Sequence, residues 1–250
     1  MNYIFCDTEG SGLFDYHKPA DAIGQPRMAA IGMILTNDDL EIEAEYAFLI
    51  KPEDWVFDNE TEAAKVNGLT HERLLAEGVD LKEPLRLYGD AIDQRRIVVG
   101  FNVIHDLKML RGELRSVGFP DRYMQTRHIC AMQGCRRIVD ARTADGRKKA
   151  PRLEEACAHF QIERHGAHTG IGDAHDVLAI MRKLRELGEM PAYTDPYDRG
   201  PKKIAPTPQA RPQGREYERQ VIAAQRSFIN TDNEDEALQD FIGGASEDGK

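Results

Sequence analysis

Three short apolar runs within the first fifty residues set the strongest limit on the fold of this chain. Each run has the length and composition of a β-strand, and polar or turn-forming segments separate them: Tyr3–Cys6, Met28–Leu35 and Tyr46–Ile50. Consecutive strands that follow one another without a helix between them favour antiparallel pairing. We therefore expect the chain to open with an antiparallel meander of three strands.

Helical periodicity takes over after about residue 60. Five segments repeat apolar residues at the helical spacing: Glu60–Val66, Glu83–Ile92, Leu107–Val117, Leu153–Phe160 and Asp173–Leu187. The continuous apolar run Ile97–Phe101 lies between two of them and is typical of a buried strand. The sequence thus predicts an α/β fold, with a mixed sheet of three antiparallel strands plus parallel strands, flanked by helices.

The composition of the chain changes near residue 190. Six of the twelve prolines fall between Pro191 and Pro212, and the last twenty residues carry seven acidic side chains and one basic one. Such a tail buries too little apolar surface to offset its ordering entropy. We expect a globular domain over residues 1–190, a Pro-rich linker over 191–214, and a short helix followed by an acidic, disordered tail over 215–250.

The cysteines and the apolar segments indicate a cytoplasmic protein. No Cys-x-x-Cys pair is present, which argues against a disulfide scaffold and a sulfur-ligated zinc site. The chain has no run near the ~20 apolar residues that a membrane span requires, and it opens without a secretory signal pattern. We expect no membrane association. The four cysteines are predicted to be buried thiols: Cys6, Cys130, Cys135 and Cys157.

Two carboxylates follow the first apolar run directly, in Asp7-Thr8-Glu9. Residues two apart on a strand point to the same face, so Asp7 and Glu9 would converge at the strand end. A solvated strand end leading into the glycine-rich loop Gly10–Gly12 explains an isolated Asp-x-Glu at least as well. The pair becomes informative only together with other acidic residues.

A further acid, Asp106, lies where the strand Ile97–Phe101 gives way to a helix. A carboxylate in the first helical turn interacts favourably with the helix dipole. Helix capping is therefore a complete structural alternative to a catalytic role for Asp106, and its position alone does not separate the two.

His168 and Asp173 precede and open the last predicted helix. Five residues turn a helix by about 500°, so these two side chains cannot share one helical face. We expect His168 on a loop, where Gly170 and Gly172 would let it move toward a substrate. The alternative is a surface histidine beside an ordinary acid at a helix N-terminus.

Together, the four acids and the histidine favour metal-dependent chemistry, because each lies at the end of a predicted element. Convergent carboxylates suit Mg²⁺ or Mn²⁺ better than zinc. Two such ions about 3.5–4 Å apart form a clamp for in-line attack on a phosphodiester. A histidine with a pKa near neutrality is suited to accept the proton of the attacking water.

Three segments resemble the motifs of the DEDDh family of 3′→5′ exonucleases, which have a ribonuclease-H-like fold and include the proofreading subunit of bacterial DNA polymerase III. The matching segments are Phe5–Leu13, Gly100–Leu107 and His168–Asp173. The segment Val66–Glu72 is also similar to the family's segment between its first two motifs. The resemblance spans roughly residues 2–187.

The resemblance implies a role for individual residues. It implies four ligands for two Mg²⁺ or Mn²⁺ ions: Asp7, Glu9, Asp106 and Asp173. It implies that His168 is the general base. It places three residues near the terminal nucleotide: Ser11, Leu13 and Asn102.

Two departures from the family pattern concern the second motif. Phe101-Asn102 replaces a common His-Asn, and His105-Asp106 replaces a common Phe-Asp. We expect His105 to pack as a buried aromatic side chain in place of the phenylalanine. His105-Asp106 and His175-Asp176 also match the dipeptide of the HD phosphohydrolases, but that all-helical fold would leave the opening strands unexplained.

The net charge of −10 at first argues against a polyanionic partner. The tail contributes −6 of it and the four candidate ligands contribute −4, which two divalent ions would cancel. The segment Arg136–Arg152 carries seven basic and two acidic residues. It is a candidate site for phosphate contacts, above all through Arg147, Lys148 and Lys149, although a solvated loop is an equal alternative.

Together with the resemblance, these patterns predict a metal-dependent exonuclease that removes nucleoside 5′-monophosphates from the 3′ end of single-stranded or frayed DNA. A ribonuclease or oligoribonuclease with the same metals is the nearest alternative, because no residue marks recognition of the 2′-hydroxyl. A non-catalytic nucleic-acid-binding replication module on the same fold is a second alternative. The acidic tail is a candidate docking peptide for a replication or repair partner.

Overall fold

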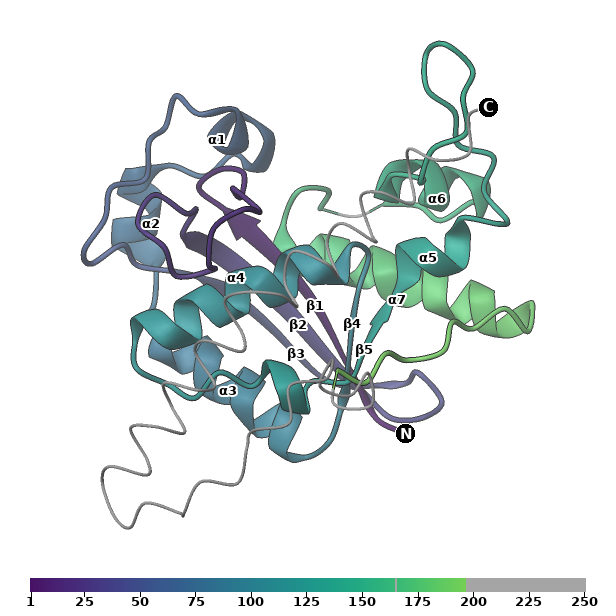
Figure 1. Cartoon of the computed structure of the whole chain (residues 1–250), viewed down its shortest axis with the longest axis horizontal. Helices are drawn as coiled ribbons and strands as arrows, with labels where there is room; N and C mark the ends of the chain where they lie inside the picture. Colours follow the sequence, from purple (N-terminus) through teal and green to yellow (C-terminus); the bar gives the residue numbers. More distant parts are fainter. Residues whose placement is uncertain (165, 197–250) are drawn as a thin grey trace, which may run out of the picture.

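The computed structural model describes residues 1–164 and 166–196 of the chain (Figure 1). Five strands form one sheet: β1 (Tyr3–Gly10), β2 (Met28–Thr36), β3 (Ile42–Leu49), β4 (Ile97–Gly100) and β5 (His128–Cys130). The described residues also contain seven α-helices: α1 (Glu62–Asn67), α2 (His71–Glu77), α3 (Lys82–Asp93), α4 (Val103–Ser116), α5 (Ala131–Cys135), α6 (Leu153–His159) and α7 (Gly170–Glu186). A 3₁₀ helix, Tyr123–Gln125, precedes β5.

The strand order in the sheet is β3-β2-β1-β4-β5. The first three strands pair antiparallel, whereas β4 joins β1 in parallel and β5 joins β4 in parallel. The mixed α/β sheet that the sequence predicts is therefore confirmed, with β1 at its centre.

Helices cover both faces of the sheet, and the alternation of side chains along β1 assigns residues to one face or the other. Tyr3 and Phe5 pack into a core with α5, α6 and α7, while Ile4 and Cys6 pack into a second core with α3 and α4. Figure 1 shows α4 and α7 on opposite sides of the strands. Odd-numbered residues of β1 thus face α7 and even-numbered residues face α4.

Several elements differ from the predicted ones in their bounds. β1 continues beyond the apolar run as far as Gly10, because β2 pairs with it over that whole length. α4 and α7 begin at Val103 and Gly170, earlier than their apolar periodicity indicates. The sequence prediction omitted α2, β5 and α5, which are too short to show a clear period.

The described part of the domain extends to Pro196. Thr194 forms an antiparallel bridge with His128 of β5, so the first residues of the predicted linker still pair with the sheet. The rest of that linker, the predicted helix and the acidic tail lie outside the described residues. Among the described residues, no helix combines the length and the apolar character that crossing a membrane requires.

Candidate active site

The C-terminal half of β1 brings Asp7 and Glu9 to the face of the sheet that α7 covers. Both residues pair with β2, Asp7 opposite Gly32 and Glu9 opposite Ala30. Because they continue the alternation of Tyr3 and Phe5, their side chains lie on the same side of the strand. The central position of β1 in the sheet fixes the backbone of both acids.

Two glycines allow the first turn of α7 to approach β1 and β2 very closely. A Cβ atom added to Gly32 would lie 2.2 Å from the carbonyl carbon of Gly170, and one added to Gly170 would lie 2.8 Å from the carbonyl oxygen of Asp7. Larger side chains at either position would push the helix away from the strands. The glycine contact therefore sets the distance between Asp7 and the residues of the first turn of α7.

Asp173 lies in that first turn, although the sequence predicted it as the first residue of the helix. The helix begins three residues earlier because the hydroxyl of Thr169 accepts a hydrogen bond from the amide of Gly172 and caps the N-terminus. The expectation that Gly170 and Gly172 form a mobile loop is wrong, since both are helical and buried. Their role is close packing.

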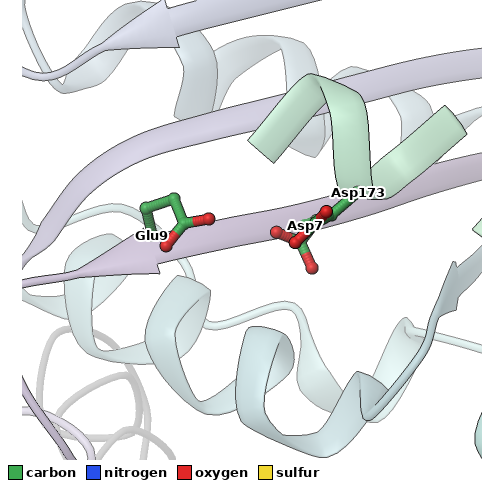
Figure 2. A group of neighbouring side chains, drawn as sticks. All are labelled: Asp7, Glu9 and Asp173. Atoms are coloured by element: carbon green, nitrogen blue, oxygen red, sulfur yellow. The ribbon is translucent and has the colours of Figure 1, made fainter. Parts of the chain in front are cut away.

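Three carboxylates meet at this contact, as Figure 2 shows. One oxygen each of Asp7, Glu9 and Asp173 lies within 4.8 Å of the others. Asp7 and Glu9 project from β1, and Asp173 projects toward them from α7. Asp173 is more than 160 positions from Asp7 and Glu9 in the sequence, and the fold brings the three side chains together, as we expected from their places at the ends of predicted elements.

Asp106 approaches from the opposite face and is not a member of this group of three. It is 4% exposed and lies in the first turn of α4. Its Oδ1 accepts hydrogen bonds from the amide of Thr8, at 2.9 Å, and from the Thr8 hydroxyl, at 2.8 Å. Thr8 is an even-numbered residue of β1 and faces α4. Asp106 therefore binds the strand between Asp7 and Glu9, and helix capping does not account for its position.

Burial and mutual repulsion raise the pKa values of these acids. Burial is the main cause for Asp7, whose pKa lies well above its usual range, and the charges of Asp106, Asp173 and Glu9 add to it. Burial followed by the charges of Asp173 and Asp106 raises the pKa of Glu9 to about 7. The pKa of Asp106 is also about 7, mainly because of burial, with the Thr8 hydrogen bonds acting in the opposite direction.

The donor set fits a hard divalent cation. Three carboxylate oxygens within 4.8 Å of one another, with a fourth buried carboxylate across the strand, provide the oxygen ligands that Mg²⁺ and Mn²⁺ prefer. The negative charges that would bind a cation also add to the effect of burial in raising the pKa values of Asp7 and Glu9. Asp7, Glu9 and Asp173 would hold such an ion, and Asp106 would complete the set.

His168 lies on the loop before α7, as the sequence predicts, and its side chain is exposed. Its backbone adopts a left-handed conformation with φ of 61°. Together with Glu9, His168 lines a cavity of about 250 Å³. The same cavity is lined by apolar residues of β2 and β3 and by polar residues that include Asn67 and Arg73. A carboxylate of the cluster and the predicted base thus share one cavity.

The three predicted nucleotide contacts have different surroundings. The Ser11 hydroxyl accepts a hydrogen bond from the amide of Arg27, which ties the loop after β1 to β2. The side chain of Leu13 is 90% exposed and is not part of the hydrophobic core. The Oδ1 of Asn102 is buried without a hydrogen bond among the described residues. Leu13 and Asn102 therefore have unused apolar surface and an unused acceptor.

Within the basic segment residues 142–148 form a hairpin, and in the described chain Arg147, Lys148 and Lys149 form no hydrogen bond or ion pair with the carboxylate cluster. Arg142 bridges Lys148 across the hairpin, which projects beyond α6 in Figure 1. Arg147 pairs with Asp145 and Lys149 pairs with Glu155, while Lys148 is exposed. Substrate binding by these residues stays a prediction, and neighbouring carboxylates offset part of their charge.

The histidines of the two His-Asp dipeptides have structural contacts. His105 packs edge-on against Phe14, with ring centroids 5.2 Å apart, and contacts the Tyr16 hydroxyl through Nδ1 at 3.1 Å. It thus packs as an aromatic side chain, as expected. His175 faces Glu45 at 3.4 Å. The five-stranded sheet excludes the all-helical HD fold.

Sequence reasoning missed two residues that contact the site acids directly. Thr8 fixes Asp106, and the alternation along β1 would have placed it on the α4 face. Arg164 contacts Asp173 through Nη2 at 2.6 Å. No feature of the sequence predicts the role of Arg164, because its contact with Asp173 depends on how the segment between α6 and α7 folds.

Comparison with known proteins matches a family model and solved structures. The family RNase T, described as exonuclease, matches residues 4–181. No curated protein matches the sequence.

The solved structures that are similar to this chain include those of exonuclease I. E. coli exonuclease I in complex with a dT13 oligonucleotide is 17% identical, with a TM-score of 0.62, over 74% of this chain and 41% of that chain. Exonuclease I from Methylocaldum szegediense is 21% identical, with a TM-score of 0.61, over 74% of this chain and 40% of that chain. The chain therefore spans less than half the length of these proteins, and the likeness shows a shared fold.

Proposed function

Because the chain belongs to the RNase T exonuclease family, we propose that it is a metal-dependent 3′→5′ exonuclease acting on single-stranded or frayed DNA ends. Membership confirms the resemblance to the DEDDh exonucleases and the assignment as an enzyme. The non-catalytic alternative is thereby disfavoured. What remains to be proposed is the substrate, the metals and the role of each residue.

The convergence of Asp7, Glu9 and Asp173 carries this proposal. Their oxygens lie within 4.8 Å of one another, and Glu9 also lines the cavity that His168 borders. When bound, two Mg²⁺ or Mn²⁺ ions would activate a water and stabilise the oxygen that leaves the phosphorus. Asp106, held by Thr8, would be the fourth ligand.

The residues of the chain have the following roles in hydrolysis. Asp7, Glu9 and Asp173 would hold the cations and so position the scissile phosphate. His168 accepts the proton of the attacking water, because its exposed imidazole lies on the rim of the cavity that Glu9 lines. The bond from phosphorus to the 3′ oxygen of the penultimate nucleotide breaks, and a nucleoside 5′-monophosphate is released.

The terminal nucleotide is held by the loops around the cluster. The exposed Leu13 would pack against the base, and Asn102, whose buried Oδ1 has no hydrogen-bond partner among the described residues, would lie beside the terminal sugar. The amide of Arg27 fixes Ser11 beside Leu13. The cavity lined by Glu9 and His168 has room for part of a nucleotide. The E. coli exonuclease I structure with dT13 supports a single-stranded DNA substrate by analogy of fold.

A single experiment tests both the polarity and the sugar preference. The full chain is incubated with Mg²⁺ and a 5′-labelled single-stranded DNA, or with the matched RNA. We expect labelled products that shorten one nucleotide at a time, release of 5′-monophosphates, and faster hydrolysis of DNA. Faster hydrolysis of RNA would assign the ribonuclease alternative, whereas activity that persists in EDTA would contradict the metal mechanism.

The acidic tail remains a proposed docking segment for a replication or repair partner, on the basis of its composition alone. Its residues lie outside the described part of the chain. Deletion of residues 231–250 is expected to leave oligonucleotide hydrolysis unchanged and to weaken association with the partner. Unchanged association would exclude the docking role.

A further inference from the structure

Arg164 bridges two acids on the first two turns of α7. Its Nη2 lies 2.6 Å from Asp173 Oδ1, and its Nε lies 2.6 Å from Asp176 Oδ2. Asp173 and Asp176 are three residues apart, so both carboxylates lie on the same side of the helix. The planar guanidinium binds both at once, which an ammonium group on a flexible stem cannot do with the same geometry.

Asp176 is an unusual partner, because it is only 4% exposed and takes no part in the carboxylate cluster. A buried carboxylate without a cation is costly, and Arg164 compensates it. Asp176 in turn balances the charge of Arg164.

The same oxygen of Asp173 also holds the loop of the predicted base. The amide of His168 donates a hydrogen bond to Asp173 Oδ1 at 3.3 Å. His168 has a positive φ of 61°, a conformation that costs energy for a residue with a side chain. The contacts of Asp173 Oδ1 thus join Arg164, four residues before His168, to the strained residue itself.

We propose that Arg164 and Asp176 form a positioning pair that orients the Asp173 carboxylate and, through it, the loop that carries His168. Arg164 and the His168 amide both bind Oδ1, so Oδ2 is the oxygen that would be left to bind a cation. This inference rests on the proposed function, because it assigns Asp173 as a ligand and His168 as the base. Neither Arg164 nor Asp176 touches the reacting atoms.

Three variants of the full chain test the pair. Arg164→Met removes the charge and both contacts. Arg164→Lys keeps the charge but loses the planar guanidinium that binds both acids. Asp176→Asn removes the negative charge of the second acid that Arg164 binds. Arg182→Met is the matched control, because Arg182 also lies on α7 and its guanidinium also makes two hydrogen bonds, both to the carbonyl oxygen of Leu40. Any loss of general stability should be similar in the control.

Two measurements do not depend on hydrolysis. In EDTA, amide hydrogen exchange over residues 166–169 should rise by about tenfold in Arg164→Met, by less in Arg164→Lys, and not at all in Arg182→Met. Calorimetric titration with Mn²⁺ alone should show weaker binding in Arg164→Met and Asp176→Asn than in the control, by about 10- to 100-fold, the effect typical of partners that orient metal ligands.

Steady-state hydrolysis then separates positioning from a purely structural role. We expect kcat to fall by about 10²-fold in Arg164→Met, as for a misplaced catalytic group, while KM changes little and Arg164→Lys recovers part of the loss. Wild-type exchange and Mn²⁺ affinity in Arg164→Met, or equal effects of Arg182→Met, would overturn the proposal.

If Arg164→Met does not fold, the same comparison is decided by Arg164→Lys. If the wild type releases no mononucleotide, the proposed function fails, whereas the exchange and Mn²⁺ results still judge the pair.

Discussion

The carboxylate cluster and the basic hairpin differ in how firmly the chain holds them. Asp7 and Glu9 lie on the central strand, and Asp173 lies on a helix that two facing glycines seat against it. The hairpin that carries Arg147 and Lys148 is exposed and makes its ion pairs locally. The core of the domain therefore fixes the positions of the cluster acids. The charges of the hairpin, which can change at little cost to the fold, would instead set the affinity for substrate.

The largest effect should follow from removing a cluster charge. Asp7→Asn or Asp173→Asn should lower hydrolysis by at least about 10³-fold, because bound metal contributes several kcal/mol and 1.36 kcal/mol equals a factor of ten. The metal-free melting temperature of Asp7→Asn should not fall, since burial and three neighbouring charges already raise the pKa of Asp7. The control Asp145→Asn, on the hairpin, should hydrolyse at nearly the wild-type rate. Equal losses in both regions would contradict the comparison.

Removing the base should have the next largest effect. His168→Ala should lower kcat by about 10²–10⁴-fold, the usual contribution of a general base, with a small change in KM. Mn²⁺ binding should persist, because His168 is not a ligand. Steady-state kinetics and calorimetry on the same sample check this, and wild-type kcat would exclude His168 as the base.

The contact between Gly32 and Gly170 allows the position of α7 to be changed without removing a charge from the cluster. Gly32→Ala would place a Cβ 2.2 Å from the backbone of Gly170, so we expect a loss of about 3 kcal/mol in the free energy of unfolding, together with weaker Mn²⁺ binding. Gly89→Ala is the control, because Gly89 lies in α3 and an added Cβ would meet its nearest neighbour, Nη2 of Arg122, only at 3.7 Å. Denaturant titration should show no loss of stability for Gly89→Ala.

The pH dependence of stability should report the charge of the cluster. Burial and nearby carboxylates raise the pKa of Glu9 to about 7 in the metal-free chain. Between about pH 4.3, the unfolded value, and this raised pKa the folded state binds more protons than the unfolded state, so stability falls as pH rises. Relative to Glu9→Gln, the wild type in EDTA should lose stability from about pH 5 to about pH 8. Denaturant titrations at both pH values check this, and an opposite slope would refute it.

The hairpin should give the smallest effect. Replacing Arg147, Lys148 and Lys149 by Gln should raise KM, leave kcat unchanged, and reduce the slope of log affinity against log salt by about 0.7 for each lost phosphate contact. Lys183→Gln, at the far end of α7, is the control. An unchanged salt dependence would remove the hairpin from the substrate site.

The sequence predicted the residues of the cluster because each follows from a local rule. The alternation along β1 puts Asp7 and Glu9 on one face, and the loop before α7 carries His168. Gly32, inside an apolar strand, was an available signal of close backbone approach. Arg164 had no such signal, because its contact with Asp173 arises only when the segment after α6 folds back over α7.

The most direct test of the central claim follows bound metal and hydrolysis in the same samples. Mn²⁺ is titrated into the full chain, free Mn²⁺ is measured by electron paramagnetic resonance, and release of 5′-monophosphates from single-stranded DNA is measured in parallel. We predict that hydrolysis rises as a second Mn²⁺ ion binds, and that Asp173→Asn loses both Mn²⁺ binding and hydrolysis. Wild-type Mn²⁺ binding in Asp173→Asn, or hydrolysis in the absence of bound metal, would contradict it.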